Sequence, residues 1–253
     1  MAHILDGRSI LITGGASGIG RAVALRCADA GAAITITDVN VEAGTGVADE
    51  IVRNGGEAQF VRLDVTDEAQ HHAAVDAAMK AFGKLDGSCN AAGKPFQGRP
   101  MHEIDPDFWE SVYALNLRSV FYATRAQVPA MLDAGRGSIV NVASTAGIAA
   151  FPGGADYCAA KGGIMSATRA AALDYAKLGI RVNSVLPGAT RTPMMQGQMD
   201  AFDGLEDMMM AANPMGRLAE PDEIAYAVRW LLSDEASFVT GTMLIVDGGL
   251  TAA

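Results

Sequence analysis

A tyrosine and a lysine stand four positions apart in the segment Tyr157–Lys161, which reads YCAAK. On a helix this spacing puts both side chains on one face, one turn from each other. A free tyrosine titrates near pH ~10, and a neighbouring ammonium favours its phenolate form. The spacing is common by chance, but here Ser144 ends a β-branched run just before it. The pair therefore predicts a proton-transferring tyrosine.

A second chemical pattern lies near the amino terminus, where Gly14–Gly20 follows a predicted strand and opens a predicted helix. Glycines let the backbone approach a pyrophosphate, and the helix start offers free N–H groups and positive potential. Asp38 closes the next strand. Its carboxylate can accept hydrogen bonds from the adenosine ribose, and at ~4 Å it would repel a 2′-phosphate by about 4 kcal/mol per charge pair. Ala16 and Val39 supply no cation, so NAD is predicted over NADP; a turn-forming aspartate is the alternative.

The elements that position these residues alternate along the chain. Predicted strands are Ser9–Thr13, Ala33–Thr37, Ala58–Leu63, Leu85–Asn90, Ser138–Ala143, Arg181–Leu186 and Thr242–Val246. Predicted helices are Gly18–Ala30, Val41–Asn54, Glu68–Phe82, Asp107–Ala134, Asp156–Leu178 and Pro221–Ser233. No linker or repeat interrupts them. We expect an α/β fold, a single Rossmann-like domain over residues 1–253 whose doubly wound parallel sheet has about seven strands and helices on both faces.

These motifs, in their order, resemble the short-chain dehydrogenase/reductase family over nearly the whole chain. The matching positions are Thr13, Gly14, Gly18, Gly20, Asp38, Asp64-Val65, Asn90–Gly93, Asn116, Ser144, Tyr157, Lys161, Pro187-Gly188, Thr192 and Val246–Gly249. The resemblance implies an oxidoreductase that moves a hydride between nicotinamide and a secondary alcohol or its ketone. The segments RTPMMQ and LLSDEASFVTG resemble in particular dehydrogenases of cyclic alcohols and diols.

The resemblance also implies a role for each of four catalytic residues. Tyr157 would exchange the proton on the substrate oxygen, and Ser144 would hydrogen-bond that oxygen. Lys161 would hold the nicotinamide ribose and lower the tyrosine pKa. Asn116 would anchor a water that completes a proton relay; a plain interior asparagine bonded to backbone is the alternative.

The implied cofactor site is larger. It comprises Gly14, Ser17, Gly18, Ile19, Gly20, Asp38, Asp64, Val65, Asn90, Ala91, Gly93, Tyr157, Lys161, Pro187, Gly188, Thr190 and Thr192. Asp64 would meet the adenine amino group, whereas Asn90 could equally tie adjacent strands together. Relatives of this kind imply a homotetramer, in which Val246–Gly249 serves packing and assembly. Alanines at 167, 170 and 171 would allow close helix packing between subunits or within one core.

A stretch with seven methionines follows the strand that ends at Leu186. It leaves the carboxyl end of a strand, where ligands bind in doubly wound folds. We expect a substrate lid at about 190–216, with gap-filling packing as the alternative. Its expected ligand-facing residues are Met194, Met195 and Met199, with hinges at Gly197 and Gly204.

We expect the substrate pocket to combine this lid with 94–97, 144–148 and 151–154, which are mostly apolar or small. A ring-containing alcohol fits such a pocket best. Two alternatives stay open. One is a 3-oxoacyl-[acyl-carrier-protein] reductase, against which Asp38 argues because such reductases usually take NADPH. The other is a non-catalytic NAD-binding protein of the same fold.

Composition excludes other classes of function. The net charge of −10 argues against nucleic acid and anionic membranes as partners. No apolar run approaches the ~20 residues of a membrane span, and the start shows no signal peptide. The cysteines (Cys27, Cys89, Cys158) form no CxxC pair and the histidines (His3, His71, His72, His102) no metal-binding spacing. The sequence therefore predicts a cytoplasmic enzyme with a small-molecule substrate and no metal.

Overall fold

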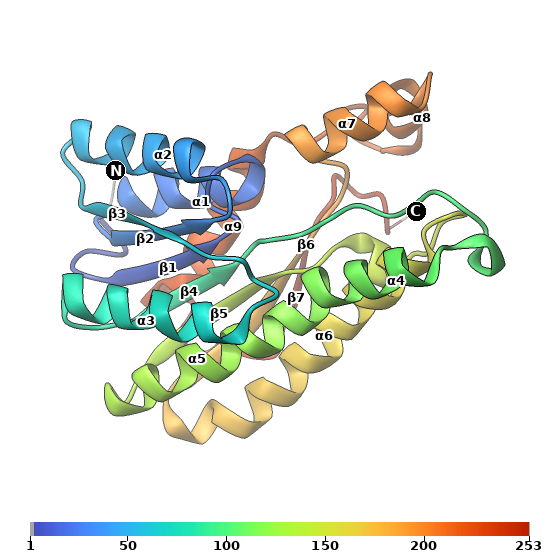
Figure 1. Cartoon of the computed structure of the whole chain (residues 1–253). Helices are drawn as coiled ribbons and strands as arrows, with labels where there is room; N and C mark the ends of the chain where they lie inside the picture. Colours follow the sequence, from blue (N-terminus) through green and yellow to red (C-terminus); the bar gives the residue numbers. More distant parts are fainter. Residues whose placement is uncertain (1–2, 253) are drawn as a thin grey trace.

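The computed structural model describes residues 3–252, and a seven-stranded sheet forms its centre (Figure 1). The strands are β1 (Ser9–Thr13), β2 (Ala33–Asp38), β3 (Ala58–Arg62), β4 (Gly87–Asn90), β5 (Gly137–Val142), β6 (Ile180–Pro187) and β7 (Met243–Val246). Their order is β3-β2-β1-β4-β5-β6-β7, and every neighbouring pair is parallel. The predicted α/β class and doubly wound sheet are confirmed.

Helices cover both faces of the sheet (Figure 1). One layer contains α1 (Gly18–Ala28), α2 (Val41–Arg53) and α9 (Pro221–Leu232). The other contains α3 (Glu68–Phe82), α4 (Pro106–Tyr113), α5 (Ser119–Asp133) and α6 (Ala155–Tyr175). Strand β1 serves both layers: Ile10 and Ile12 join the core beneath α1 and α9, while Leu11 joins the core beneath α3 and α5. Because both faces are covered, the central strands β1, β4 and β5 are buried along their whole length.

The predicted helix Asp107–Ala134 is not uniform. A π-helical turn at Ala114–Arg118 separates α4 from α5. Asn116 stands in this turn and is fully buried. Its amide bonds the backbone of a neighbouring segment, as described below, which accounts for the local departure from α-helical geometry. Such single π turns recur at functional sites.

The sheet reverses its winding between β1 and β4, which lie side by side with Thr13 opposite Asn90. The chain leaves these two strands towards opposite layers. The Thr13 hydroxyl accepts hydrogen bonds from the N–H groups of Ala91 (3.2 Å) and Ala92 (3.4 Å) and so ties the two strand ends together. In doubly wound sheets, ligands bind at this reversal, outside the carboxyl ends of the strands.

The methionine-rich stretch folds as two short helices, α7 (Pro193–Ala201) and α8 (Leu205–Ala212). They stand apart from the two layers, on the carboxyl side of the sheet (Figure 1). Gly204, with φ +77°, connects them. Neither helix of this described stretch holds a fully buried residue. Among residues 3–252, no helix is both long and apolar enough to cross a membrane.

Candidate active site

A cavity of about 1090 Å3 opens at the carboxyl ends of the strands, between the sheet and α7–α8. Of the sequence-predicted site residues, Gly14, Ser17, Gly18, Ile19, Gly20, Asp38, Asp64, Val65, Ala91, Gly93, Ser144, Tyr157, Lys161, Pro187, Gly188, Thr190 and Thr192 line it. One cavity therefore joins the glycine loop at one end to the tyrosine and lysine at the other.

The glycine loop needs its glycines for close backbone approach. Gly14 has φ +67°, and a Cβ there would lie 2.8 Å from the Cα of Ala92. A Cβ on Gly20 would collide with the Gly14 carbonyl. Helix α1 then starts at Gly18 after Ser17, and within the described chain no side chain caps this start. Its first N–H groups stay available for an anion such as a pyrophosphate.

Asp38 lies at the end of β2 on the cavity wall. One carboxylate oxygen accepts a hydrogen bond from the Ala16 N–H (3.2 Å), and the other accepts from the Asn40 N–H (3.0 Å). Asp38 thus forms the turn that the alternative interpretation expected and also faces the glycine loop. No cation accompanies it at Ala16 or Val39, so a negative group dominates this end of the cavity.

Asp64 and Val65 form the adjoining wall. The Asp64 carboxylate accepts hydrogen bonds from the hydroxyl (2.7 Å) and the N–H (2.9 Å) of Thr66, and these bonds lower its pKa. The Val65 carbonyl lies 3.0 Å from Nε2 of the buried His71. His71 therefore packs behind the cavity. Groups of three or more potential metal ligands are absent from the described residues.

Tyr157 is the third residue of α6, and its ring stands beside Phe96 with ring centroids 6.4 Å apart. Burial raises the Tyr157 pKa to about 12, while a hydrogen bond with the Ser144 side chain acts to lower it. The Ser144 oxygen also accepts from the Ala146 N–H (3.1 Å), which leaves the serine hydroxyl proton available to the tyrosine oxygen. Ser144 and Tyr157 therefore act on the same point of the cavity.

Lys161 lies one turn further along α6 and is 4% exposed. Its ammonium donates a hydrogen bond to the Val142 carbonyl (2.9 Å) and stands 5.5 Å from the centroid of the Tyr157 ring. Burial lowers the Lys161 pKa to about 8. In the chain alone, desolvation is the largest influence on the Tyr157 pKa. That the ammonium and a positively charged nicotinamide together favour the phenolate stays a prediction.

The side chains of the two asparagines of the predicted site are buried and held in hydrogen bonds. Asn116 clamps Lys94: its Oδ1 accepts from the Lys94 N–H (3.1 Å) and its Nδ2 donates to the Lys94 carbonyl (3.0 Å). Asn90 donates to Asn141 (2.8 Å) and accepts from Gln127 (2.9 Å) in the sheet interior. Neither is among the described residues that line the cavity. These bonds agree with the strand-tying alternative for Asn90 and with the backbone-bonded alternative for Asn116. The relay role of Asn116 stays a prediction.

After β6 the chain forms the last wall of the cavity. The Thr190 hydroxyl donates to the Gly188 carbonyl (3.0 Å) and shapes the turn behind Pro187. Thr192 caps α7 by accepting from the Met195 N–H (3.2 Å). A Cβ on Gly18 would lie only 3.3 Å from Thr192, so this segment touches the glycine loop directly.

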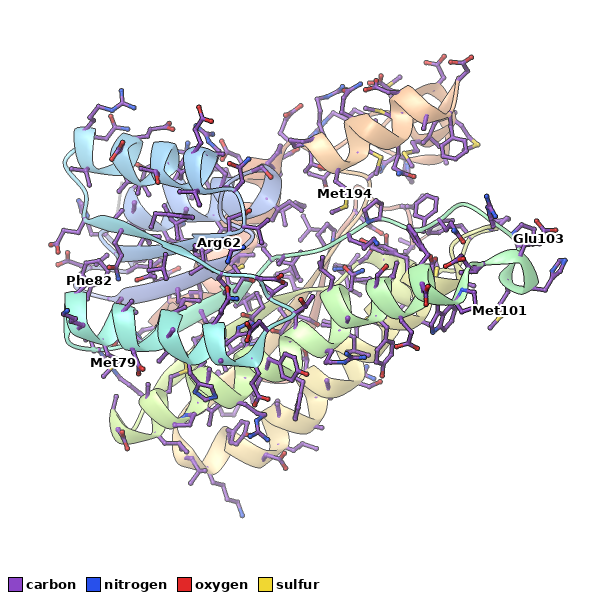
Figure 2. The ribbon with its side chains drawn as sticks, viewed as in Figure 1. Arg62, Met79, Phe82, Met101, Glu103 and Met194 are labelled. Carbon is purple, nitrogen blue, oxygen red and sulfur yellow. The ribbon has the colours of Figure 1, made fainter. Side chains whose placement is uncertain are left out.

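The remainder of the cavity is mostly apolar, as expected for a substrate site. Its further lining includes Pro95, Phe96, Thr145, Phe151, Pro152, Met194, Met195, Gln198, Phe202, Leu205, Met208, Met209 and Leu250. Met194 is the second residue of α7 and lies between this helix and the segment after β4 (Figure 2). Several residues expected in the pocket are not among the described lining residues: Lys94, Gln97, Gly147, Ile148, Gly153, Gly154 and Met199. Leu250 was missed, and no local pattern marks it.

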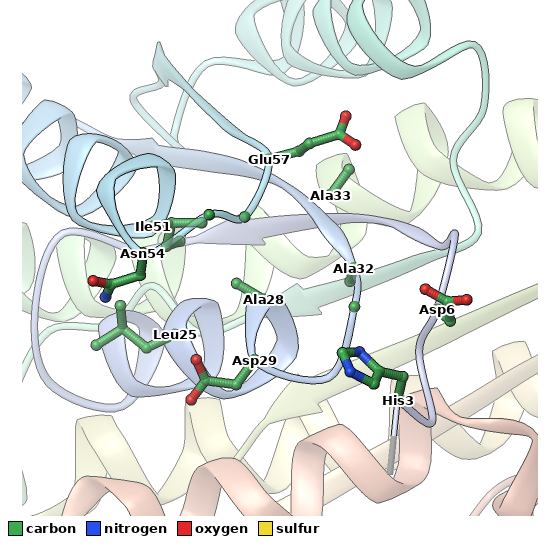
Figure 3. Close-up of a pocket in the computed structure, with 13 residues that line it drawn as sticks. His3, Asp6, Leu25, Ala28, Asp29, Ala32, Ala33, Ile51, Asn54 and Glu57 are labelled. Carbon is green, nitrogen blue, oxygen red and sulfur yellow. The ribbon is translucent and has the colours of Figure 1, made fainter. Parts of the chain in front are cut away.

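A second hollow, of about 530 Å3, lies at the opposite edge of the sheet (Figure 3). His3, Asp6, Asp29, Asn54 and Glu57 surround it. It sits at the amino end of β2, away from the glycine loop, and its carboxylates would repel a phosphate. This second hollow therefore does not suit a dinucleotide, and the larger cavity is the candidate active site.

A parallel sheet with a glycine loop at its winding reversal, opening into a cavity with a tyrosine and a lysine, defines an enzyme of the dinucleotide-dependent oxidoreductase class. Residues 14–251 match the family model described as enoyl-(acyl carrier protein) reductase. The chain belongs to the short-chain dehydrogenase/reductase family. Enzymes of this family use nicotinamide cofactors.

Similar proteins cover the whole chain. A 2,5-dichloro-2,5-cyclohexadiene-1,4-diol dehydrogenase of Sphingobium indicum is 44% identical over 98% of each chain. A cyclohexanol dehydrogenase of an Acinetobacter species is 41% identical over 100% of this chain and 98% of its own. Among solved structures, levodione reductase superposes with a TM-score of 0.95 at 37% identity, over 98% of this chain and 99% of its own. This chain is thus a dehydrogenase or ketoreductase.

Proposed function

We propose that this enzyme interconverts a secondary alcohol on an apolar ring and its ketone, with NAD as cofactor. The observation that carries the proposal is the convergence of Tyr157, Ser144 and Lys161 at one end of an apolar cavity. Tyr157 is the proton donor and acceptor for the substrate oxygen. Ser144 hydrogen-bonds the same oxygen and stabilises its developing charge. Lys161 holds the nicotinamide ribose and, with Asn116, completes the proton path to solvent.

The residues fit a dinucleotide of the NAD type. The uncapped start of α1 and the close-packed Gly14 and Gly20 suit a pyrophosphate. Asp38 suits the free hydroxyls of the adenosine ribose and disfavours a phosphate there. Asp64, Val65 and the Asn90–Gly93 backbone would border the adenosine, and Pro187 to Thr192 the nicotinamide. When bound, the cofactor supplies the hydride acceptor or donor; the chain itself binds, orients and handles the proton.

The shape and chemistry of the cavity favour a ring. Phe96, Phe151, Met194 and Met195 give it flat and deformable apolar walls near the tyrosine. The names of the relatives point the same way, since they are dehydrogenases of cyclohexanol and of a chlorinated cyclohexadiene diol. Residues 190–216 act as the lid over this substrate.

The test is a panel of cyclic and acyclic secondary alcohols with NAD and NADP, followed by the absorbance of the reduced cofactor. Cyclohexanol with NAD should be among the best pairs. The panel includes an acetoacetyl thioester with NADPH, because a 3-oxoacyl-[acyl-carrier-protein] reductase is the alternative that the sequence left open. If the thioester is turned over faster than the alcohols, that alternative replaces the proposal. If no compound of the panel is turned over, a non-catalytic NAD-binding role replaces it.

We propose a cytoplasmic homotetramer. Phe121 (55% exposed) lies on α5, Leu173 (83%) on α6 and Leu178 (49%) just after it, while Phe238 (103%) and Ile245 (43%) lie before and within β7. Large exposed apolar side chains of this kind suit subunit interfaces. Ala167 and Ala170 are exposed on α6, whereas Ala171 packs against the internal core. The three cysteines are free thiols, which suits the cytoplasm. Light scattering on the Leu173→Glu variant tests the assembly.

A further inference from the structure

Asp156 stands at the start of α6, directly before the tyrosine, and its carboxylate bridges two segments. One oxygen accepts a hydrogen bond from the Tyr157 N–H (2.8 Å), and the other accepts from the Gln97 N–H (3.1 Å). The side chain is 3% exposed. The free N–H groups and positive potential at the start of α6 favour a carboxylate at this position.

The bridge controls an aromatic wall of the cavity. The Gln97 N–H belongs to the same planar peptide group as the Phe96 carbonyl, so its hydrogen bond also fixes the Phe96 backbone. The Phe96 ring packs edge-on against Phe151 (4.9 Å between centroids) and lies 6.4 Å from the Tyr157 ring. Phe96, Phe151 and Tyr157 all line the cavity, whereas Asp156 is not among the described lining residues.

The segment that carries Phe96 depends on such ties. Between β4 and α4 the chain crosses the molecule in an extended path with a single 3₁₀ turn at Met101–Glu103 (Figure 1). Asn116 holds it at Lys94 and Asp156 holds it at Gln97. The Gln97 side chain continues the connection by accepting from the Asp105 N–H (2.9 Å) at the start of α4.

We propose that Asp156 is a positioning residue that holds Phe96 against Tyr157 and thereby makes the site selective for ring-shaped alcohols. This proposal rests on the proposed function. A ring held with its hydroxyl at Tyr157 contacts the Phe96 wall, whereas a three-carbon alcohol leaves that wall unfilled. Loosening the wall therefore weakens ring binding more than it changes proton transfer.

The central variant is Asp156→Asn, which keeps the shape of the side chain. An amide has one acceptor oxygen, so its NH2 group must face one of the two N–H donors. Asp156→Ser is the second variant: it accepts from the helix start but is too short to reach Gln97. Asp174→Asn, an exposed carboxylate on the same helix, controls for charge. Thermal unfolding and NADH fluorescence establish that each variant folds and binds cofactor.

Asp156→Asn and Asp156→Ser should raise the KM for cyclohexanol by about tenfold, the scale of a lost apolar contact. The KM for 2-propanol and the pH profile of kcat should stay near wild type. In a Phe96→Ala background the Asp156→Asn effect should vanish, because the two residues act through one wall. Asp174→Asn should match wild type throughout.

Three results would overturn the positioning role. They are an equal loss of activity towards both alcohols, a shifted pH profile of kcat, and an undiminished effect of Asp156→Asn in the Phe96→Ala background. An unchanged ratio of the two KM values would do the same. Failure of the wild type to oxidise any cyclic alcohol is a separate result. It would refute the proposed function itself, before any variant is compared.

Discussion

The ammonium of Lys161 stands 5.5 Å from the centroid of the Tyr157 ring and is bonded to the Val142 carbonyl. The nearby ammonium does not offset the effect of burial on the tyrosine. Burial therefore raises the Tyr157 pKa to about 12 in the chain without cofactor. The lysine carries its own penalty, since burial lowers its pKa to about 8.

Replacement of Tyr157 by Phe should lower kcat by about 10²–10⁴-fold, because only the transferable proton is lost. The ring and its packing on Phe96 remain, so the dissociation constant of NADH, measured by fluorescence, should stay within about twofold. Lys161→Ala should differ by raising the KM of the cofactor as well. A Tyr157→Phe enzyme that keeps a tenth of wild-type kcat would show that another group moves the proton.

Alcohol oxidation should accelerate as the pH rises. In this direction the site must accept a proton, and burial keeps Tyr157 protonated until its raised pKa of about 12 is approached. The positive charge of the oxidised nicotinamide should shift the rise in rate to lower pH without abolishing it. The kcat of oxidation should therefore be several-fold higher at about pH 9 than at about pH 7. A profile that is flat over this range would contradict the assignment of Tyr157 as the base.

Lys161→Met should stabilise the enzyme in the absence of cofactor. The folded pKa of Lys161, about 8, lies below the ordinary lysine value of 10.5, so the buried charge destabilises the fold at neutral pH. This penalty, on the order of 1–3 kcal/mol, disappears as the pH rises through the window from about 8 to 10.5. Denaturant unfolding should show the variant more stable than wild type at pH 7, with the difference shrinking above pH 10. A difference that is independent of pH would point to packing instead of charge.

Cofactor preference should reside in Asp38. The wild type should favour NAD over NADP by at least about tenfold in kcat/KM, since a 2′-phosphate would face the carboxylate. Asp38→Ala combined with Val39→Arg should shift the preference towards NADP, and Asp38→Ala alone should mainly remove the discrimination. The comparison is made at one fixed alcohol concentration. Equal use of both cofactors by the wild type would refute this interpretation.

The lid offers a matched pair of methionines on one helix. Met195 lines the cavity, and Met199, four residues later on α7, is not among the described lining residues. Met195→Ala should raise the KM for cyclohexanol several-fold more than for 2-propanol, while Met199→Ala should leave the ratio unchanged. Proteolysis between Gln196 and Asp207 should also slow when NADH and a substrate analogue bind. Identical behaviour of the two variants, without ligand protection, would make α7 a packing element.

The sequence alone was sufficient to predict the parallel sheet. It also singled out the glycine loop, Asp38 and the Tyr157–Lys161 pair, all of which line the cavity. These depend on local features: apolar runs set the strands, glycines permit close backbone approach, and a four-residue spacing places two side chains on one helical face. The order of the motifs along the chain then indicated the family. None of these inferences requires knowing which distant residues meet.

Only the tertiary structure decided which way individual side chains point. Asn90 and Asn116 carry the same amide, yet one bonds Gln127 and Asn141 inside the sheet and the other clamps Lys94. Asp156 meets Gln97 across 59 residues of chain. These partners are selected by packing between the end of β4, the π turn and α6. Because that packing depends on long-range contacts, no local pattern could have revealed them.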